Sequence, residues 1–256
     1  MTSVVNFVSE YFYVYLWLVF TTFVNIVAPT SGSTVINPVT AFFTDPYRAI
    51  GISGFIFFFT GLHRAYLFRK EILSDKLNLR AIKSMLPYSI VGAIGGGLLI
   101  SYLNIKLLAA TIVVVSVYFI YKTIKQIIQK AKIEKKNSGL GFAFIALLSG
   151  FLQSSGMPGS DIRNNYLRTS LSEISVRAVG SAIGLVNFFI GGTIIFLSNR
   201  LTHKDIIFIV SIIPFLIIAQ IYGKKFLDKM TDRKAKILAI TLSSLGIVLL
   251  SYKYLL

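Results

Sequence analysis

Apolar blocks long enough to cross a lipid bilayer fill most of this sequence. Breaks at Pro, Gly and charged residues delimit them as 9–28, 47–66, 84–103, 107–121, 139–152, 174–197, 206–222 and 237–254. About 20 apolar residues let a helix cross the hydrocarbon core, and 55% of the residues are hydrophobic while only 14% are charged. The chain is therefore predicted to be an all-α integral membrane protein, multi-pass in the cell membrane.

Residue types on which many enzymes depend are scarce. The sequence has no cysteine and two histidines, His63 and His203, which excludes thiol catalysis, cysteine-based metal sites and histidine clusters. We therefore expect no enzyme, cofactor or metal. The net charge of +16 does not require a nucleic-acid partner, because cytoplasmic loops of membrane proteins collect Lys and Arg.

The two halves of the sequence form a weak internal repeat. Sliding the chain on itself by 129 residues places Pro29 on Pro158 and residues 48–51 on 177–180, and slips of 127 and 131 align later positions in the same order. The chain is interpreted as one membrane domain made of two repeats, 1–127 and 128–256, with a basic linker over 122–138.

Two short segments, 30–43 and 158–172, occupy equivalent places in the repeats. Residues 9–28 and 30–43 together would make a helix of about 50 Å at 1.5 Å per residue, too long for one crossing of a core of about 30 Å. We therefore expect an out-and-back hairpin. Each repeat then contains a short-helix hairpin plus three transmembrane helices, an odd number of crossings, so the second repeat is predicted to be inverted.

The distribution of Lys and Arg agrees with inversion. Inverted halves place the segments 67–83, 122–136 and 224–236 on one side, with seventeen Lys and Arg residues against four on the other. Parallel halves would give fourteen against seven. The inverted arrangement follows the positive-inside rule better and places both termini outside.

Inverted repeats with short, discontinuous helices are typical of secondary transporters, whose substrates bind where the halves meet. Each short segment follows a Gly-, Ser- and Pro-rich turn, and the free N–H groups at a helix start attract anions. Candidate anion-binding residues are Thr30, Ser31, Gly32, Ser33, Asn37, Ser155, Gly159 and Ser160. The alternative is that the Gly, Ser and Pro residues only permit tight turns and close helix packing.

The second short segment also carries charged groups. Asp161, Asn164 and Arg168 share one helical face, while Arg163 points the opposite way. Ionisable groups inside a membrane are usually functional, so Arg163 or Arg168 would neutralise the anion, and Asp161 would pair with an arginine or relay a coupled proton. The alternative places this segment at the aqueous surface with solvated charges.

Several other polar residues allow two interpretations. Asp45, which precedes a proline, is predicted to cap a helix. Arg48 and Arg177 are repeat equivalents that would act as interfacial anchors or as gate residues. His63 is expected to end a helix beside the basic loop, and Asn187 would join helices or line the site.

Particular motifs resemble a known family. They are Tyr47-Arg48-Ala49-Ile50-Gly51-Ile52-Ser53, His63-Arg64, Ser149-Gly150-Phe151, Gly156-Met157-Pro158-Gly159 and Arg177-Ala178-Val179-Gly180-Ser181. Over nearly its whole length the chain resembles the TauE/SafE sulfite exporter family, also called the toluene sulfonate uptake permeases. The resemblance implies transport of sulfite, a sulfonate or a related small sulfur-containing anion.

The sequence thus predicts a secondary transporter or exporter of a small sulfur-containing anion that works by alternating access among membrane lipids. One alternative is a small-anion channel. Another is a membrane subunit that handles a sulfur compound without transporting it, although a sulfur relay would favour a cysteine thiolate, which the sequence lacks. The oligomeric state, the coupling ion and the direction of transport stay open.

Overall fold

A computed structural model describes residues 2–27, 32–129, 139–227 and 232–256, and every regular element in these ranges is an α-helix. The all-α prediction is therefore confirmed. In chain order the helices are α1 (Thr2–Val27), α2 (Gly32–Phe43), α3 (Pro46–Leu67), α4 (Arg69–Ser74), α5 (Lys76–Tyr102), α6 (Ile105–Gln129), α7 (Gly139–Ser154), α8 (Gly159–Leu167), α9 (Glu173–Leu197), α10 (His203–Leu227) and α11 (Asp232–Tyr254).

Six helices in the described ranges are long and apolar enough to cross a membrane: α3, α5, α6, α9, α10 and α11. Only 22% to 50% of each apolar stretch is buried inside the protein. The remainder includes large exposed side chains such as Val91, Val114 and Val248. Helices that are apolar on their outer faces as well need lipid around them, so this is a multi-pass integral membrane protein.

The helix boundaries differ from the prediction mainly in the basic segments. The loop expected over 67–83 is largely helical, because α4 fills its start and α5 begins at Lys76. Asp75 caps α5 by accepting a hydrogen bond from the Leu77 backbone N–H at 2.8 Å. Lys and Arg are good helix formers, so a charge-rich stretch that leaves the membrane can stay helical.

Glycines allow α5 and α7 to pack with their backbones in contact. A Cβ added to Gly92 would lie 1.9 Å from the Leu147 carbonyl oxygen, and one added to Gly150 would lie 1.9 Å from the Ser89 carbonyl oxygen. Small residues at a helix crossing permit this approach. The α7 arm of the second hairpin is therefore fixed tightly against a long helix of the first half.

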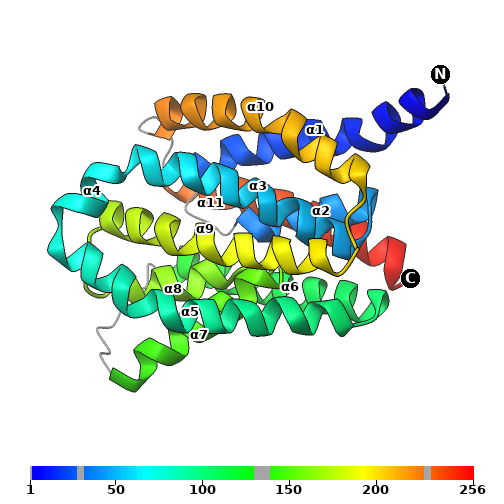
Figure 1. Ribbon diagram of the computed structural model, residues 1–256. Coiled ribbons are helices and arrows are strands. Elements are labelled where there is room, and N and C mark those ends of the chain that lie inside the picture. Colours follow the sequence, from blue (N-terminus) through cyan, green and yellow to red (C-terminus); the bar gives the residue numbers. More distant parts are fainter. Residues whose placement is uncertain (1, 28–31, 130–138, 228–231) are drawn as a thin grey trace.

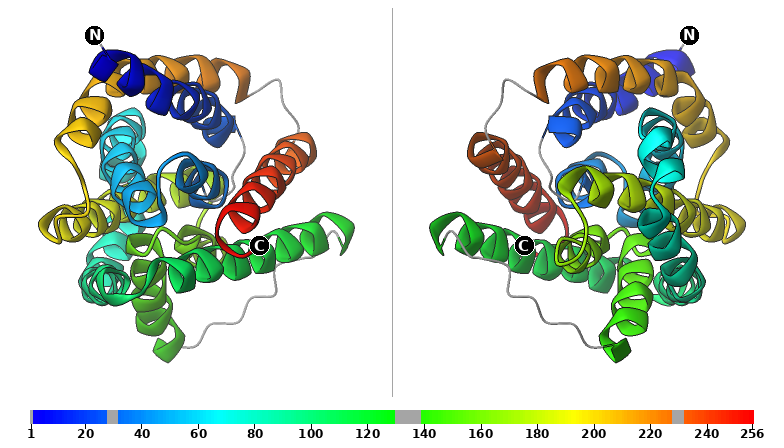
Figure 2. Two further views of the ribbon diagram at one scale, coloured as in Figure 1. Left: turned by 90° about the vertical axis from the view of Figure 1, so that its right-hand side faces the viewer. Right: turned by 90° about the vertical axis from the view of Figure 1, so that its left-hand side faces the viewer.

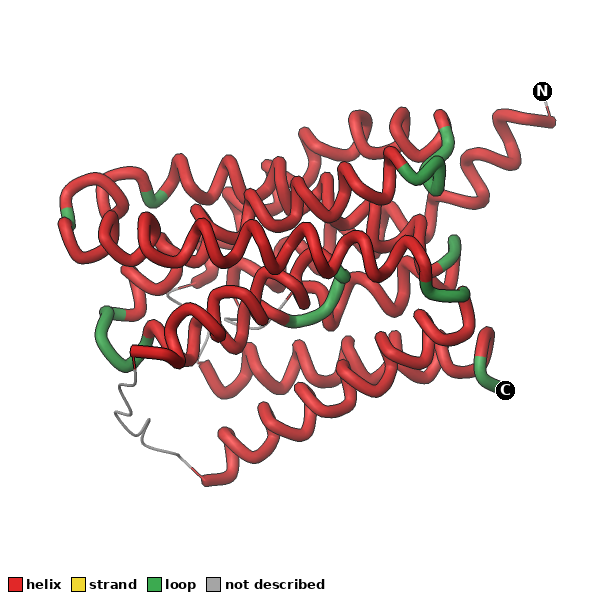
Figure 3. Tube along the Cα trace, turned by 60° about the horizontal axis from the view of Figure 1, so that its bottom comes forward, coloured by secondary structure: helices red, strands yellow, loops and turns green. Residues whose placement is uncertain are grey.

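Both chain termini lie at one end of the helical bundle, and α4 lies at the opposite end (Figure 1). We call these the terminal end and the basic end. Most connections lie at the two ends, whereas the turn after α7 lies between them (Figure 3), and residues 153–159 are buried. Views along the bundle show α2 surrounded by longer helices (Figure 2). The short helix α2 and the turn after α7 thus lie inside the bundle.

Candidate functional site

The short helix α2 supplies a buried polar surface from the first half. Ser33, Asn37 and Thr40 are all buried, and α2 packs against α1, α3, α6 and α11. Gly32 begins the helix. The predicted anion-binding residues Thr30 and Ser31 lie outside the described residues.

The turn between α7 and α8 supplies the second buried surface. Ser155 is fully buried, and its hydroxyl donates to the Phe151 carbonyl oxygen at 2.7 Å. Gly156 has a φ of 73°, a left-handed conformation that favours glycine. Gly159 begins α8, and a Cβ there would lie 2.3 Å from the Ser149 carbonyl oxygen. Gly159 therefore permits close packing of α8 on α7.

The two short-helix hairpins touch each other. The side-chain amide of Asn37 in α2 donates a hydrogen bond to the Gly156 carbonyl oxygen in the α7–α8 turn. A Cβ at Gly156 would lie 2.7 Å from Asn37 Nδ2, so a side chain at this turn would displace the Asn37 amide. The Asn37 Oδ1 atom is buried without a hydrogen-bond partner within the described chain.

Arg163 is the buried charge of α8. Only 2% of the residue is exposed, and its guanidinium donates to Gln153 Oε1 at 2.9 Å and to the Gly180 carbonyl oxygen at 3.0 Å. Both acceptors are uncharged. Its Nε is buried without a hydrogen-bond partner among the described residues.

A buried polar network extends from this arginine to α5. Gln153 Oε1 also accepts from Asn187 Nδ2 at 2.6 Å, and Asn187 Nδ2 donates to Ser89 Oγ at 2.8 Å. The network joins α5, α7, α8 and α9 around one guanidinium. The sequence left two roles open for Asn187 and did not indicate Gln153 or Ser89. A glutamine near the end of an apolar block is nevertheless a signal that can mark a buried polar network.

The other polar residues of 158–172 lie nearer the surface. Arg168 ends α8 and forms two hydrogen bonds of 2.9 Å with the Glu173 carboxylate, so its charge is compensated. Ser160, Asp161 and Asn164 are half-buried. The Asn164 Oδ1 atom is without a hydrogen-bond partner in the described ranges. The buried face of α8 is thus that of Arg163, opposite the polar stripe.

The capping prediction for Asp45 is confirmed, because its carboxylate accepts from the backbone N–H groups of Tyr47 and Arg48 at 2.9 and 3.0 Å. His63 does not end its helix, since α3 continues to Leu67. Instead its Nδ1 lies 2.6 Å from Gln220 Oε1 in α10. The histidine therefore links two long helices.

The described residues thus include a buried guanidinium held between α7 and α9 and, separately, an amide that joins the two hairpins. A guanidinium is a group that binds oxyanions. Searches of curated proteins and of solved structures returned no match. A family model for the sulfite exporter TauE/SafE matches residues 14–250, nearly the whole chain. Members of this family are membrane transporters of sulfur-containing anions such as sulfite. The chain belongs to the TauE/SafE sulfite exporter family.

Proposed function

We propose that this protein is a secondary transporter that carries sulfite, or a related small sulfur oxyanion or organosulfonate, by alternating access. The substrate site lies where the α1–α2 hairpin meets the α7–α8 hairpin. Arg163 provides its positive charge, and the amide and hydroxyl groups around it orient the anion.

The observation that carries this proposal is the burial of the Arg163 guanidinium between neutral hydrogen-bond acceptors. An arginine stays protonated in proteins, and the two hydrogen-bond acceptors of this buried guanidinium, Gln153 and Gly180, are both uncharged. Partly exposed Asp161 contributes an electrostatic attraction, but it is not one of these acceptors. A buried charge whose hydrogen-bond acceptors are neutral is costly. A bound oxyanion would offset that cost and accept the free Nε–H.

The contact between the hairpins supports a shared site. Asn37 and Gly156 belong to different halves of the chain and are joined by a hydrogen bond. Helix starts also attract anions, by about 0.3–1 kcal/mol at exposed positions and up to about 2 kcal/mol when partly buried. The starts of α2 and α8 would therefore assist Arg163, with Ser33, Ser155, Gly159 and Ser160 as further contacts.

Packing between the halves supports the two-repeat layout. In the predicted repeat, α1 corresponds to α7, α3 to α9, α5 to α10 and α6 to α11. The structure has α5 packed on α7 and, correspondingly, α10 packed on α1, while α3 packs on α9 and α6 on α11. Such reciprocal pairs are what a two-fold relation between the halves would produce.

Purified protein in liposomes tests the role of Arg163. We expect Arg163→Gln to abolish sulfite flux, because the substitution keeps a hydrogen-bond donor but removes the charge. Arg168→Gln is the matched control, since Arg168 is paired with Glu173 at the surface, and it should retain most of the flux. Parental flux from a well-folded Arg163→Gln protein would refute this assignment.

A further inference from the structure

We propose that Tyr11, Arg48 and Asp205 form a gate that closes the terminal end of the substrate path. We call these three residues the terminal gate. The inference rests on the proposed alternating access, because a carrier must close one end of its path while the other end is open.

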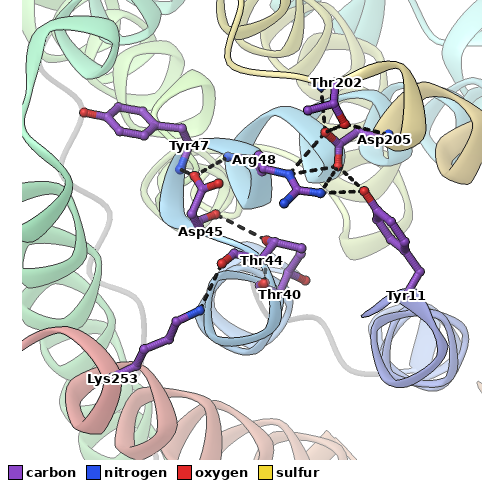
Figure 4. Close-up of polar contacts among 9 residues, drawn as sticks. All are labelled: Tyr11, Thr40, Thr44, Asp45, Tyr47, Arg48, Thr202, Asp205 and Lys253. Atoms are coloured by element: carbon purple, nitrogen blue, oxygen red, sulfur yellow. Dashed lines mark hydrogen bonds and ion pairs between the residues drawn. The ribbon is translucent and has the colours of Figure 1, made fainter. Parts of the chain in front are cut away.

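The terminal gate is a partly buried ion pair with a third member. Asp205 in α10 is fully buried, and its Oδ1 lies 2.9 Å from Arg48 Nη2 in α3. Arg48 Nε donates to both carboxylate oxygens, at 3.1 and 3.2 Å. The Tyr11 hydroxyl in α1 donates to Asp205 Oδ1 at 2.7 Å and accepts from Arg48 Nη2 at 2.5 Å. Figure 4 shows the three side chains converging from three helices.

The local sequence fixes each partner in place. Thr202 and Asp205 form a capping box at the start of α10, in which the carboxylate accepts from the Thr202 backbone N–H at 2.7 Å and the Thr202 hydroxyl accepts from the Asp205 N–H at 3.3 Å. Asp45 caps α3 and thereby sets Arg48 within its first turn. Both members of the ion pair lie at capped helix starts, so a movement of α3 against α10 would separate them.

The terminal gate joins the two halves of the chain. Tyr11 and Arg48 belong to the first half, and Asp205 belongs to the second. A second charged contact crosses the halves at the same end, where Lys253 Nζ in α11 donates to the carbonyl oxygens of Phe42 and Thr44, at 2.6 and 2.9 Å, at the end of α2. Opening the terminal end by moving one half against the other would break both contacts.

At the corresponding place at the basic end, the described residues form a neutral contact between the halves. The same slips that align the halves match Arg48 with Arg177 and Asp205 with Asn78. Asn78 donates to the Ser175 hydroxyl at 3.2 Å, whereas the Arg177 Nε lies 3.9 Å from Glu173 in its own helix. An ion pair thus connects the halves at one end and a neutral hydrogen bond at the other. This asymmetry favours a resting state that is closed at the terminal end.

Cysteine labelling tests the gate without any substrate. Thr40 is fully buried in α2 and lies one helical turn before Thr44, near the terminal gate (Figure 4), and the parental chain has no cysteine. A Thr40→Cys protein in sealed, oriented vesicles is treated with a membrane-impermeant thiol reagent on the terminal side. We expect Asp205→Asn to raise the labelling rate at least ten-fold, which corresponds to about 1.4 kcal/mol in the opening equilibrium. Tyr11→Phe, which removes only a hydroxyl, should produce a smaller rise.

Two controls separate gating from general loosening. Glu173→Gln also removes a carboxylate that is paired with an arginine, but within the second half, so it should leave Thr40→Cys labelling unchanged. Met85→Cys reports on the packed core of α5 near the basic end, and it should stay unlabelled in the Asp205→Asn background.

The outcomes distinguish this inference from the proposed function. Unchanged Thr40→Cys labelling in both folded gate variants would overturn the gate, even if sulfite flux is normal. Equal increases at Thr40→Cys and Met85→Cys would overturn it as well, because they indicate loosening of the whole protein. A selective increase in labelling at Thr40→Cys supports the gate. The absence of sulfite flux in the parental protein would refute only the transport proposal.

Discussion

Gln153→Glu is a nearly isosteric change that tests the charge at the centre of the proposed site. The Gln153 Oε1 atom accepts from Arg163 at 2.9 Å and from Asn187 at 2.6 Å. A glutamate keeps this acceptor oxygen, so both hydrogen bonds of the network can still form. The substitution nevertheless adds a permanent negative charge beside the guanidinium, and the site then has no net positive charge to offer an anion.

The size of the effect follows from the geometry. Two unit charges about 4 Å apart interact by about 4 kcal/mol at an effective dielectric constant of about 20. A carboxylate in hydrogen-bond contact with Arg163 would cancel attraction of this order for a bound anion. Even half of it, about 2 kcal/mol, weakens binding about 30-fold, and the full amount weakens it nearly 1,000-fold.

Sulfite affinity measured by calorimetry on the purified protein, together with thermal stability in the same detergent, provides the test. We expect Gln153→Glu to lose affinity while its stability is kept, because a buried arginine gains a counter-charge. Gln220→Glu is the matched control, since Gln220 is equally buried but contacts His63 and Thr60 instead. It should bind sulfite like the parent. Parental affinity in a folded Gln153→Glu protein would refute the dependence of binding on the charge of Arg163.

Three further predictions concern topology, packing and the hairpin contact. Single cysteines at Lys76 and Lys225 should react with an impermeant reagent from the same side of the membrane, and labelling from opposite sides would contradict the inverted repeats. Gly150→Ala should lower the free energy of unfolding by about 1–3 kcal/mol, because its Cβ would overlap a backbone carbonyl of α5. Gly95→Ala should be tolerated, because its Cβ would have only one side-chain atom within 4 Å, at 3.9 Å. Equal stability of the two variants would contradict the packing. Asn37→Ala should slow sulfite flux at least ten-fold by removing the contact between the hairpins, and unchanged flux would show that this contact is dispensable.

The long helices could be predicted because a bilayer imposes a simple rule on composition. Blocks such as 174–197 match α9 within one residue, since a crossing helix must be apolar over about 20 residues. The rule does not fix helix ends in water, which is why α5 begins at Lys76 rather than near residue 84. There the helix start depends on a single capping residue, Asp75.

The candidate site could be predicted only in part. The short segment 158–172 was found from its charges, but helical spacing alone did not decide whether Arg163 or Arg168 is buried. That depends on Gln153 and Gly180, which reach Arg163 through the fold. Likewise Arg48 and Asp205 are 157 positions apart, and no local pattern indicates that they pair.

The packing of Gly246 could not be predicted for a related reason. It lies in the apolar block 237–254, where the local sequence does not indicate which helix it contacts. In the structure, a Cβ there would lie 2.9 Å from a side-chain atom of Val39 in α2. The position of a glycine in an apolar block does not indicate whether its neighbour is lipid or another helix.

Counterflow of radiolabelled sulfite into proteoliposomes tests directly whether this protein is a sulfite carrier. We expect saturable uptake that is accelerated when the vesicles contain unlabelled sulfite, because a carrier returns faster when loaded. Arg163→Gln should lose this acceleration. Sulfite uptake that neither saturates nor responds to internal sulfite would indicate a channel. The absence of any protein-dependent sulfite or sulfonate flux from folded protein would contradict carrier-type transport by this protein.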